Sequence, residues 1–249
     1  MTEARSGPVP PPQLPFSMPA GATQLILVRH GSSAVPLPGE PVRMTGGQAD
    51  PSLSGPGRQQ AVAVAHRLRN ETVAVLLATP LRRTAETAAP LATAIGIGVE
   101  VIDALREVHL GEWEQEFSCR LAQGEPLLRE VIRAGRWDIA PGAESMEAFG
   151  RRAATGLGIA ADRAGPDACA VVFTHGGVIA EACRQVTASA PFAFLQAENA
   201  SITRLARLAS GRWILRSFND TAHLEQARCP EFNGRRPAAP RAAAKGKAR

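Results

Sequence analysis

The sequence predicts a three-layer α/β/α fold with a mostly parallel central sheet and helices on both faces. Short continuous apolar runs bounded by turn residues are typical of strands that are buried on both faces. Segments with helical spacing alternate with these runs, as expected for parallel strands joined by helical crossovers. The 249 residues are 45% hydrophobic and 20% charged, so the chain has ample apolar material for a core.

Six segments are expected to form strands. Four of them are apolar runs, and the last two are joined by a turn at Ser210-Gly211. They span residues 25–28, 73–78, 99–102, 170–173, 201–208 and 213–218. No apolar run approaches the roughly 18 residues that a membrane span needs, so no membrane contact is expected.

Helices are expected between these strands. Ser54 is a suitable N-cap for a helix through Arg69, and Thr79 followed by Pro80 is a suitable start for the next helix, which places Arg82 in its first turn. Further helices are expected over residues 119–139, from 145 to about 163 and from 178 to about 186. Residues 32–50 form a long loop rich in glycine, proline and serine, and such loops are usually functional or mobile.

Both ends of the chain are expected to be disordered. Residues 1–22 form a proline-rich arm without the apolar segment of a secretory signal, and residues 229–249 form a basic tail. Six positive charges and no acidic residue follow Gly234, so the net charge of +5 becomes −1 for the rest of the chain. Such a tail could bind nucleic acid or an acidic membrane weakly, but a solvated end is favoured and no specific nucleic-acid partner is expected. A single domain is expected over residues 23–228.

The cysteines and histidines do not show metal-site spacing. The four cysteines have no CxxC pair, which indicates free thiols in a reducing, cytoplasmic compartment; they are Cys119, Cys169, Cys183 and Cys229. No HExxH motif and no magnesium-type carboxylate cluster is present, so neither a metal nor another cofactor is expected.

Several chemically active side chains follow the predicted parallel strands, which all point their carboxyl ends at one edge of the sheet. Arg29-His30, Arg82, Glu107 and His175 would therefore converge there. Any one of them alone is explained equally well as a surface arginine or a structurally satisfied histidine, but together they indicate a reaction centre. Arginine forks suit phosphoryl oxygens, a neutral imidazole is a competent nucleophile at phosphorus, and a carboxylic acid can protonate a leaving alkoxide. Helices that begin after Pro80 and Gly177 would point N–H groups at the same place.

Five ordered motifs match a known family. They are Arg29-His30-Gly31, Asp50-Pro51-x-Leu53-Ser54-x-x-Gly57, Thr79-Pro80-Leu81-x-Arg83-Thr84-x-Glu86-Thr87, Leu105-Arg106-Glu107 with Gly111-x-Trp113-Glu114, and Thr174-His175-Gly176-Gly177. Over roughly residues 25–224 the chain resembles the histidine phosphatase superfamily, with its phosphoglycerate mutase-like fold.

The resemblance implies roles for the matching residues. His30 would be the phosphorylated nucleophile and Glu107 the proton donor. Arg29, Arg82 and His175 would hold the phosphoryl oxygens, and no metal would be used. Backbone and substrate would approach closely at Gly31 and Gly176.

The chain departs from the family pattern after the first motif. Ser32-Ser33 stands where members often have Glu-Thr, and the Trp-Asn that commonly follows is missing. The phosphate contact of that asparagine is expected to pass to Ser32, Ser33 or a backbone amide. Gln115 also replaces a common glycine.

Other polar and aromatic residues are expected to be structural. Arg83 is expected to face solvent or pair with Glu86. Asn199 and His223 are expected to make structural hydrogen bonds, and Trp113 and Trp137 to be packing anchors. Five further arginines are expected on solvated helix faces, with recognition of an anionic substrate group as the alternative; they are Arg43, Arg120, Arg129, Arg133 and Arg136.

Three functions are compatible with these observations. The favoured one is a metal-independent phosphomonoesterase that acts on a small phosphorylated metabolite through phosphohistidine. The second is a phosphoglycerate mutase-type phosphotransferase, although cofactor-dependent mutases of this fold have a longer insertion than residues 112–140 offer. The third is a catalytically idle binding protein that uses its basic tail. The sequence does not name the substrate, and it leaves a homodimer open.

Overall fold

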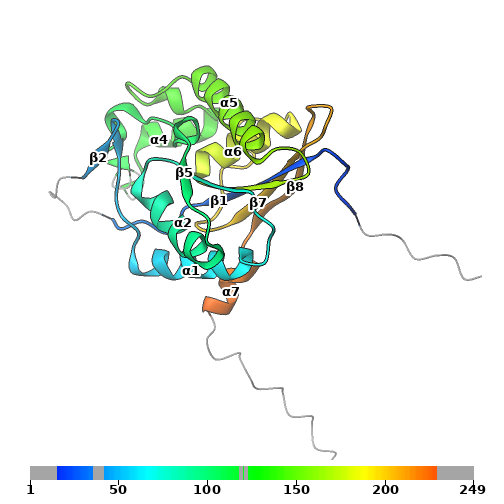
Figure 1. Cartoon of the computed structure of the whole chain (residues 1–249). Coiled ribbons are helices and arrows are strands. Elements are labelled where there is room, and N and C mark those ends of the chain that lie inside the picture. Colours follow the sequence, from blue (N-terminus) through cyan, green and yellow to red (C-terminus); the bar gives the residue numbers. More distant parts are fainter. Residues whose placement is uncertain (1–15, 36–41, 118–119, 121–122, 229–249) are drawn as a thin grey trace, which may run out of the picture.

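The computed structural model describes residues 16–35, 42–117, 120 and 123–228 (Figure 1). Residues 1–15 of the predicted arm and the whole predicted basic tail lie outside these ranges. In the described part of the chain, no helix is long and apolar enough to cross a membrane.

The predicted mostly parallel sheet is confirmed. Its six strands lie in the order β5-β4-β6-β1-β7-β8. The first four in this order are parallel to one another, and β7 and β8 are antiparallel additions beside β1. The strands are β1 (Thr23–Arg29), β4 (Val75–Ala78), β5 (Val99–Val101), β6 (Cys169–Thr174), β7 (Ile202–Arg207) and β8 (Trp213–Asp220).

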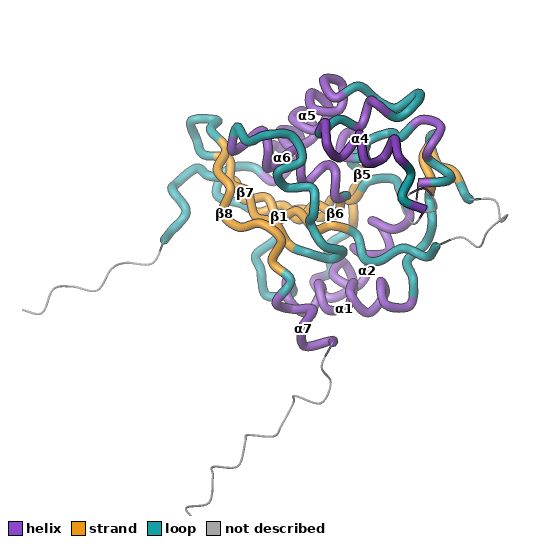
Figure 2. Tube along the Cα trace, turned by 180° about the vertical axis from the view of Figure 1, so that it is seen from behind, coloured by secondary structure: helices purple, strands orange, loops and turns teal. Residues whose placement is uncertain are grey.

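Helices cover both faces of the sheet, as predicted. Figures 1 and 2 show α1 (Gly55–Leu68), α2 (Arg82–Ile95) and α7 (Ala222–Arg228) on one face. The other face is covered by α4 (Pro126–Ala134), α5 (Met146–Ala164) and α6 (Gly176–Thr187).

The apolar run of β1 is continuous because both of its faces are buried. Leu25 and Leu27 belong to the core under α5 and α6, whereas Ile26 and Val28 belong to the core under α1 and α2. All four side chains are fully buried. Successive strand residues point to opposite faces, so a strand between two helical layers needs apolar residues at every position.

The start of α1 is as predicted, but that of α2 is not. Ser54 caps α1 by accepting from the Gly57 N–H at 3.1 Å. Thr79 was expected to cap the next helix; instead α2 begins at Arg82 after Leu81, which provides no side-chain cap. The Arg82 N–H is satisfied by the buried Asp50, whose Oδ1 accepts it at 2.6 Å.

The helix predicted over residues 119–139 is interrupted in the structure. Among the described residues, 120 and 123 are helical, Gly124 forms a turn, and α4 follows, before a 3₁₀ turn, η3 (Trp137–Ile139). Gly135 ends α4 with a left-handed conformation, φ +67°, which glycine adopts without strain.

The long loop predicted over residues 32–50 contains a small hairpin. Its strands are β2 (Met44–Thr45) and β3 (Gln48–Ala49), joined by Gly46 and Gly47 at φ +57° and +80°. Two consecutive positive φ values suit a two-residue hairpin turn. The hairpin packs on the segment after β5, which holds the turns η1 (Asp103–Leu105) and η2 (Gly111–Trp113).

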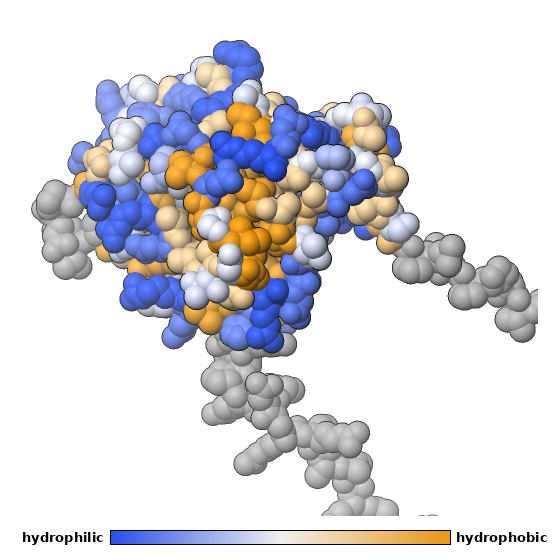
Figure 3. Space-filling view, viewed as in Figure 1, coloured by the Kyte–Doolittle hydropathy of each residue, from blue (hydrophilic) through white to orange (hydrophobic). Residues whose placement is uncertain are grey.

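The surface in Figure 3 has a band of hydrophobic residues between two hydrophilic regions, in the area where Figure 1 shows β5. At this sheet edge Val101 is 60% exposed. The edge strand has only three residues, a length that limits pairing with another chain. The homodimer that the sequence leaves open stays a prediction.

Two glycines of α5 provide a matched test of the packing that supports the segment after β5. A Cβ at Gly156 would lie 2.5 Å from Leu105 Cδ2, and Leu105 is fully buried. A Cβ at Gly158 would meet nothing within 4 Å. We predict that Gly156→Ala lowers the free energy of unfolding by about 1–2 kcal/mol through overpacking. Gly158→Ala should raise it by about 0.5–1 kcal/mol.

Urea unfolding of both variants, followed by circular dichroism, tests this contrast. Equal effects of the two substitutions would mean that the contact between α5 and Leu105 does not constrain the fold.

Candidate active site

Two histidines meet at the carboxyl edge of the sheet. His30 follows β1 and His175 follows β6, and these parallel strands pair in register up to Arg29 opposite Thr174. The His30 N–H continues the ladder by donating to the Thr174 carbonyl at 2.9 Å. The ring centroids are 5.3 Å apart at an interplanar angle of 61°. Two segments far apart in sequence are thus brought together by strand pairing, as predicted.

The surroundings of His30 define which ring nitrogen is free. Nδ1 lies 2.7 Å from the Gly31 carbonyl oxygen, and because a carbonyl can only accept, Nδ1 is the protonated nitrogen. Nε2 then holds the lone pair. Asn199 donates its Nδ2 to the His30 carbonyl at 3.0 Å, which confirms the structural hydrogen bond predicted for Asn199.

His175 is hydrogen-bonded at Nε2, whereas His30 is hydrogen-bonded at Nδ1. His175 Nε2 lies 3.0 Å from Thr79 Oγ1, which in turn lies 2.9 Å from Thr84 Oγ1. Thr79 therefore orients the imidazole rather than capping a helix. Among the described residues, His175 Nδ1 is buried without a hydrogen-bond partner. Leaving a buried polar atom unpaired costs free energy, so a bound ligand oxygen would stabilise this arrangement.

The prediction for the two adjacent arginines of α2 was wrong. Arg82, expected in the site, has a 42% exposed side chain that pairs with Glu86 at 3.1 Å. Arg83, expected at the surface, is only 8% exposed and donates to the Ala49 carbonyl at 2.8 Å. Its charge is the largest electrostatic cause of the lowered pKa values of both histidines, after burial. Each helical residue turns the side-chain direction by about 100°, so neighbouring positions face differently and only Arg83 faces the site.

Arg29 is the second cation beside the histidines. One of its terminal nitrogens donates to the Ala197 carbonyl. Its Nε is buried without a partner among the described residues, and a Cβ at Gly176 would lie 3.3 Å from it. Burial lowers the pKa of the Arg29 guanidinium and the nearby Glu107 raises it, but an arginine stays cationic in proteins.

Glu107 reaches the site from the segment after β5. Its Oε2 accepts from the Gly177 N–H at 3.1 Å, and its Oε1 accepts from the Val108 N–H at 3.0 Å. A Cβ at position 177 would lie 2.5 Å from Oε1, so a larger residue there would displace the Glu107 carboxylate. The N–H groups that were expected to point at a phosphate after Pro80 and Gly177 are thus partly used, since carboxylates bind those of Arg82 and Gly177.

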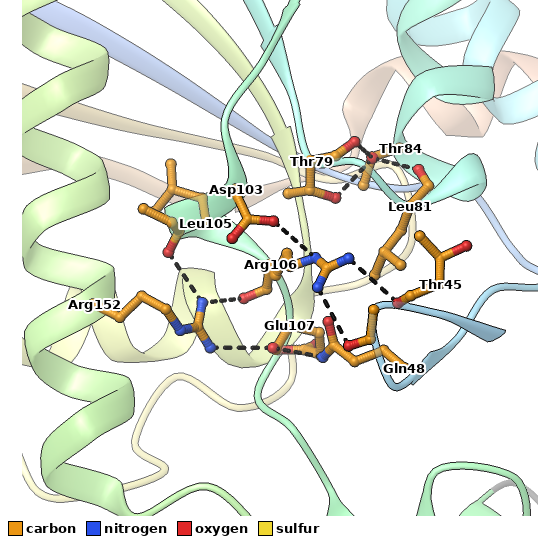
Figure 4. A network of polar contacts seen from close by, with 12 residues as sticks. Thr45, Gln48, Thr79, Leu81, Thr84, Asp103, Leu105, Arg106, Glu107 and Arg152 are labelled. Carbon is orange, nitrogen blue, oxygen red and sulfur yellow. Dashed lines mark hydrogen bonds and ion pairs between the residues drawn. The ribbon is translucent and has the colours of Figure 1, made fainter.

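A polar network fixes the backbone of Glu107 (Figure 4). From α5, Arg152 donates to the carbonyls of Ala104, Arg106 and Glu107 at 3.0, 2.8 and 3.2 Å. Glu144 pairs with Arg152 at 2.6 Å and so holds its guanidinium in place.

The β2–β3 hairpin binds the same segment from the other side. Gln48, which is 3% exposed, donates its Nε2 to the Glu107 carbonyl at 2.8 Å. Arg106 donates to the Thr45 carbonyl at 3.3 Å and pairs with Asp103 at 3.1 Å. The contacts of Gln48 with Glu107 and of Arg106 with Thr45 were not predicted, because these partners are distant in sequence and no local pattern relates them.

The predicted phosphate-binding loop is only partly available for a ligand. The Gly31 N–H donates to Thr87 Oγ1 at 3.0 Å, and the Ser32 N–H donates to Gln60 Oε1 at 2.8 Å. Ser33 Oγ is buried without a partner among the described residues. Of the two serines proposed to replace the missing asparagine, Ser33 therefore has an unpaired hydroxyl.

His223 and the two tryptophans have the structural roles that were predicted for them. His223 Nε2 bonds the Ala200 carbonyl at 3.0 Å, and Trp113 and Trp137 are packed at 2% and 8% exposure. Cys169 and Cys183 are free and buried, whereas Cys119 and Cys229 lie outside the described residues. In the described ranges, no group of three or more His, Cys, Asp or Glu side chains could hold a metal ion.

The electrostatics keep both histidines neutral at pH 7. Burial and the charges of Arg83 and Arg29 hold the pKa of His30 well below its ordinary 6.5, and His175 shifts in the same direction for the same main reasons. The unfolded chain binds protons on these rings below about pH 6.5 while the folded chain does not, so stability should fall as the pH drops through this range. A neutral imidazole pair beside two cations favours an anionic ligand.

Comparisons with known proteins agree with this geometry. The family model described as the histidine phosphatase superfamily (branch 1) matches residues 25–221. A protein of Erwinia tasmaniensis described as "Probable phosphoglycerate mutase GpmB" is 30% identical over 226 residues, covering 84% of this chain and 98% of that protein. The protein of the same description from Yersinia enterocolitica is 29% identical over 225 residues, with the same coverage. The solved structure of mycobacterial glucosyl-3-phosphoglycerate phosphatase has a TM-score of 0.65 and 29% identity, covering 80% of this chain and 100% of that one.

The fold and the paired histidines define a phosphoglycerate mutase-like α/β protein. The chain belongs to the histidine phosphatase superfamily, whose members are phosphatases or mutases.

The pKa of His30 distinguishes the roles of the adjacent arginines. We predict that His30 titrates well below pH 6.5 in the wild type, and that Arg83→Gln raises its pKa toward the ordinary value by removing the larger of the two cationic influences. Arg82→Gln should leave the pKa unchanged, because that side chain faces solvent and Glu86. A ¹⁵N NMR titration of the imidazole nitrogens measures all three proteins. A rise in Arg82→Gln but not in Arg83→Gln would reverse our assignment.

Proposed function

We propose that the protein is a metal-independent phosphomonoesterase that acts on a small phosphorylated metabolite through a phosphohistidine intermediate. The observation that supports this most strongly is the pair of imidazoles 5.3 Å apart beside Arg29 and Arg83. One imidazole has its Nε2 lone pair free for attack, and the other has an unpaired Nδ1. A tetrahedral oxyanion fits the polar groups that this arrangement leaves unsatisfied.

In the first step, His30 Nε2 attacks phosphorus and the bond from phosphorus to the ester oxygen breaks. The Gly31 carbonyl stabilises the positive charge that develops on the ring, because it accepts from Nδ1–H. Arg29, Arg83 and His175 bind the phosphoryl oxygens and stabilise the charge that they gain in the transition state. Glu107, in its acid form, gives its proton to the leaving alkoxide.

In the second step, water attacks the phosphorus of phosphohistidine and the nitrogen–phosphorus bond breaks. Glu107, now a carboxylate, takes a proton from that water, and inorganic phosphate leaves with neutral His30 restored. The two-step route divides one difficult displacement into two easier ones. The backbone network around Glu107 supports this role, because an acid must be placed within hydrogen-bond reach of the leaving oxygen.

A mutase is the second candidate function. The two relatives that are 29–30% identical are described as probable phosphoglycerate mutases, which favours it. A mutase returns the phosphoryl group to substrate and needs water kept from phosphohistidine. The phosphatase among the similar structures, at 29% identity, supports hydrolysis to the same degree. An idle binding protein is disfavoured, because two imidazoles, two guanidinium groups and a carboxylate meet at one edge of the sheet.

Removal of the nucleophile tests the proposal directly. We predict that His30→Ala lowers turnover of p-nitrophenyl phosphate by at least about a thousandfold, since the substitution removes the lone pair that attacks phosphorus. His66→Ala, at an exposed position of α1, should retain wild-type activity. The assay is run with a chelator and without divalent metal. Near wild-type turnover by His30→Ala would refute the assignment.

The acid role of Glu107 predicts a dependence on the leaving group. Glu107→Gln should lower kcat about 10²–10⁴-fold for an alkyl phosphate, whose alkoxide needs a proton. For p-nitrophenyl phosphate, whose leaving group needs none, the loss should be less than about tenfold. Glu112→Gln, at an exposed position nearby, is the control. Equal losses on both substrates would exclude Glu107 as the acid.

A further inference from the structure

A cavity of about 430 Å³ lies beside the candidate active site. The residues that line it include Arg29, Gln60, Leu195, Gln196, Glu198 and Asn199. Its volume is within the range of small-molecule sites, roughly 300–1,000 Å³.

Three residues that line the cavity also belong to the active site or bond its backbone. Arg29 belongs to both the cavity and the anion-binding group. Gln60 Oε1 accepts from the Ser32 N–H at 2.8 Å, and Asn199 donates to the His30 carbonyl at 3.0 Å. The residues just before β7 lie at the sheet edge where β1 ends, because β7 is antiparallel to β1. A phosphate ester bound at His30 can therefore extend its alcohol portion into this space.

The polar side chains of the lining are suited to binding hydroxyl groups rather than an anionic group in addition to the phosphate. Gln60, Gln196 and Asn199 have carboxamide side chains, which both donate and accept hydrogen bonds, as a hydroxyl does. The cation of the lining is Arg29, which is already bound to the Ala197 carbonyl and faces the phosphoryl site.

Three of the five arginines that were considered for an anionic substrate group are paired with carboxylates of the chain, which supports the same conclusion. Arg43 lies 3.7 Å from Asp50, and Arg136 lies 2.7 Å from Asp138. Arg120 is bound by both Glu116 and Glu125, at 2.7 and 3.2 Å. Their charges are thus compensated by carboxylates of the chain itself.

We infer that this cavity is the leaving-group subsite and that it takes an uncharged polyhydroxylated alcohol, so that the substrate is a sugar or polyol phosphate monoester. The inference rests on the proposed function and narrows its substrate class. Gln196 determines specificity here without contacting the reacting atoms.

Binding and turnover are measured with three probes: glucose 6-phosphate, 3-phosphoglycerate and ethyl phosphate. Binding is measured by calorimetry on His30→Ala, which keeps the cavity but cannot form the intermediate. We expect glucose 6-phosphate to bind at least about tenfold more tightly than the other two, from two or more additional hydrogen bonds. The wild-type values of kcat/KM should follow the same order.

Gln196→Leu tests the lining itself, since it keeps the approximate size and removes the amide. It should raise KM for glucose 6-phosphate about three- to tenfold, and it should change KM for p-nitrophenyl phosphate much less, because that leaving group has no hydroxyl whose hydrogen bond could be lost. Gln59→Leu, at the exposed position beside Gln60 on α1, should change neither.

Tightest binding of 3-phosphoglycerate, or no effect of Gln196→Leu on glucose 6-phosphate, would overturn the subsite. In that case hydrolysis of p-nitrophenyl phosphate by the wild type would still uphold the phosphatase. Conversely, absence of that hydrolysis would refute the phosphatase, and the binding order on His30→Ala would still decide the subsite.

Discussion

The pairing of β1 with β6 is the constraint on which the site depends. It places His30 and His175 on neighbouring strand ends, although 145 positions separate them in the sequence. The apolar side chains of both strands are buried on both faces, so a shift in register would disturb two cores at once. The buried pairing of β1 with β6 therefore fixes the positions of the two imidazoles and limits their movement.

Placing two imidazoles beside two arginines has an electrostatic consequence. Burial and the cations keep both rings unprotonated, which leaves a lone pair for chemistry and removes a competing positive charge. The third component, Glu107, is not on a strand and needs support of its own. Arg152 from α5 and Gln48 from the β2–β3 hairpin provide it by holding the same backbone carbonyl from two sides. The site thus combines the edge of the buried sheet, which holds the histidines, with the segment after β5, whose backbone is held by hydrogen bonds.

The sequence allowed the fold class and most of the strands to be predicted, because buried runs and strand-end motifs are local signals. His30, His175, Arg29 and Glu107 were found for the same reason. Arg83 was missed in favour of Arg82, because side chains of adjacent helical residues point about 100° apart and the start of α2 was placed two residues too early. The hairpin and Arg152 were missed because their partners lie far away in sequence, as in the 45-residue separation between Arg152 and the Glu107 carbonyl. Such contacts exist only once the chain is folded.

The central claim is that His30 becomes phosphorylated, and trapping that intermediate tests it most directly. The protein is mixed with a phosphate ester, quenched in base within milliseconds and analysed by mass spectrometry of its peptides. We expect one phosphoryl group on His30, stable in base and lost in acid, and none on the His30→Ala protein. A phosphoryl group on Ser33 or on a cysteine, with His30 unmodified, would contradict it.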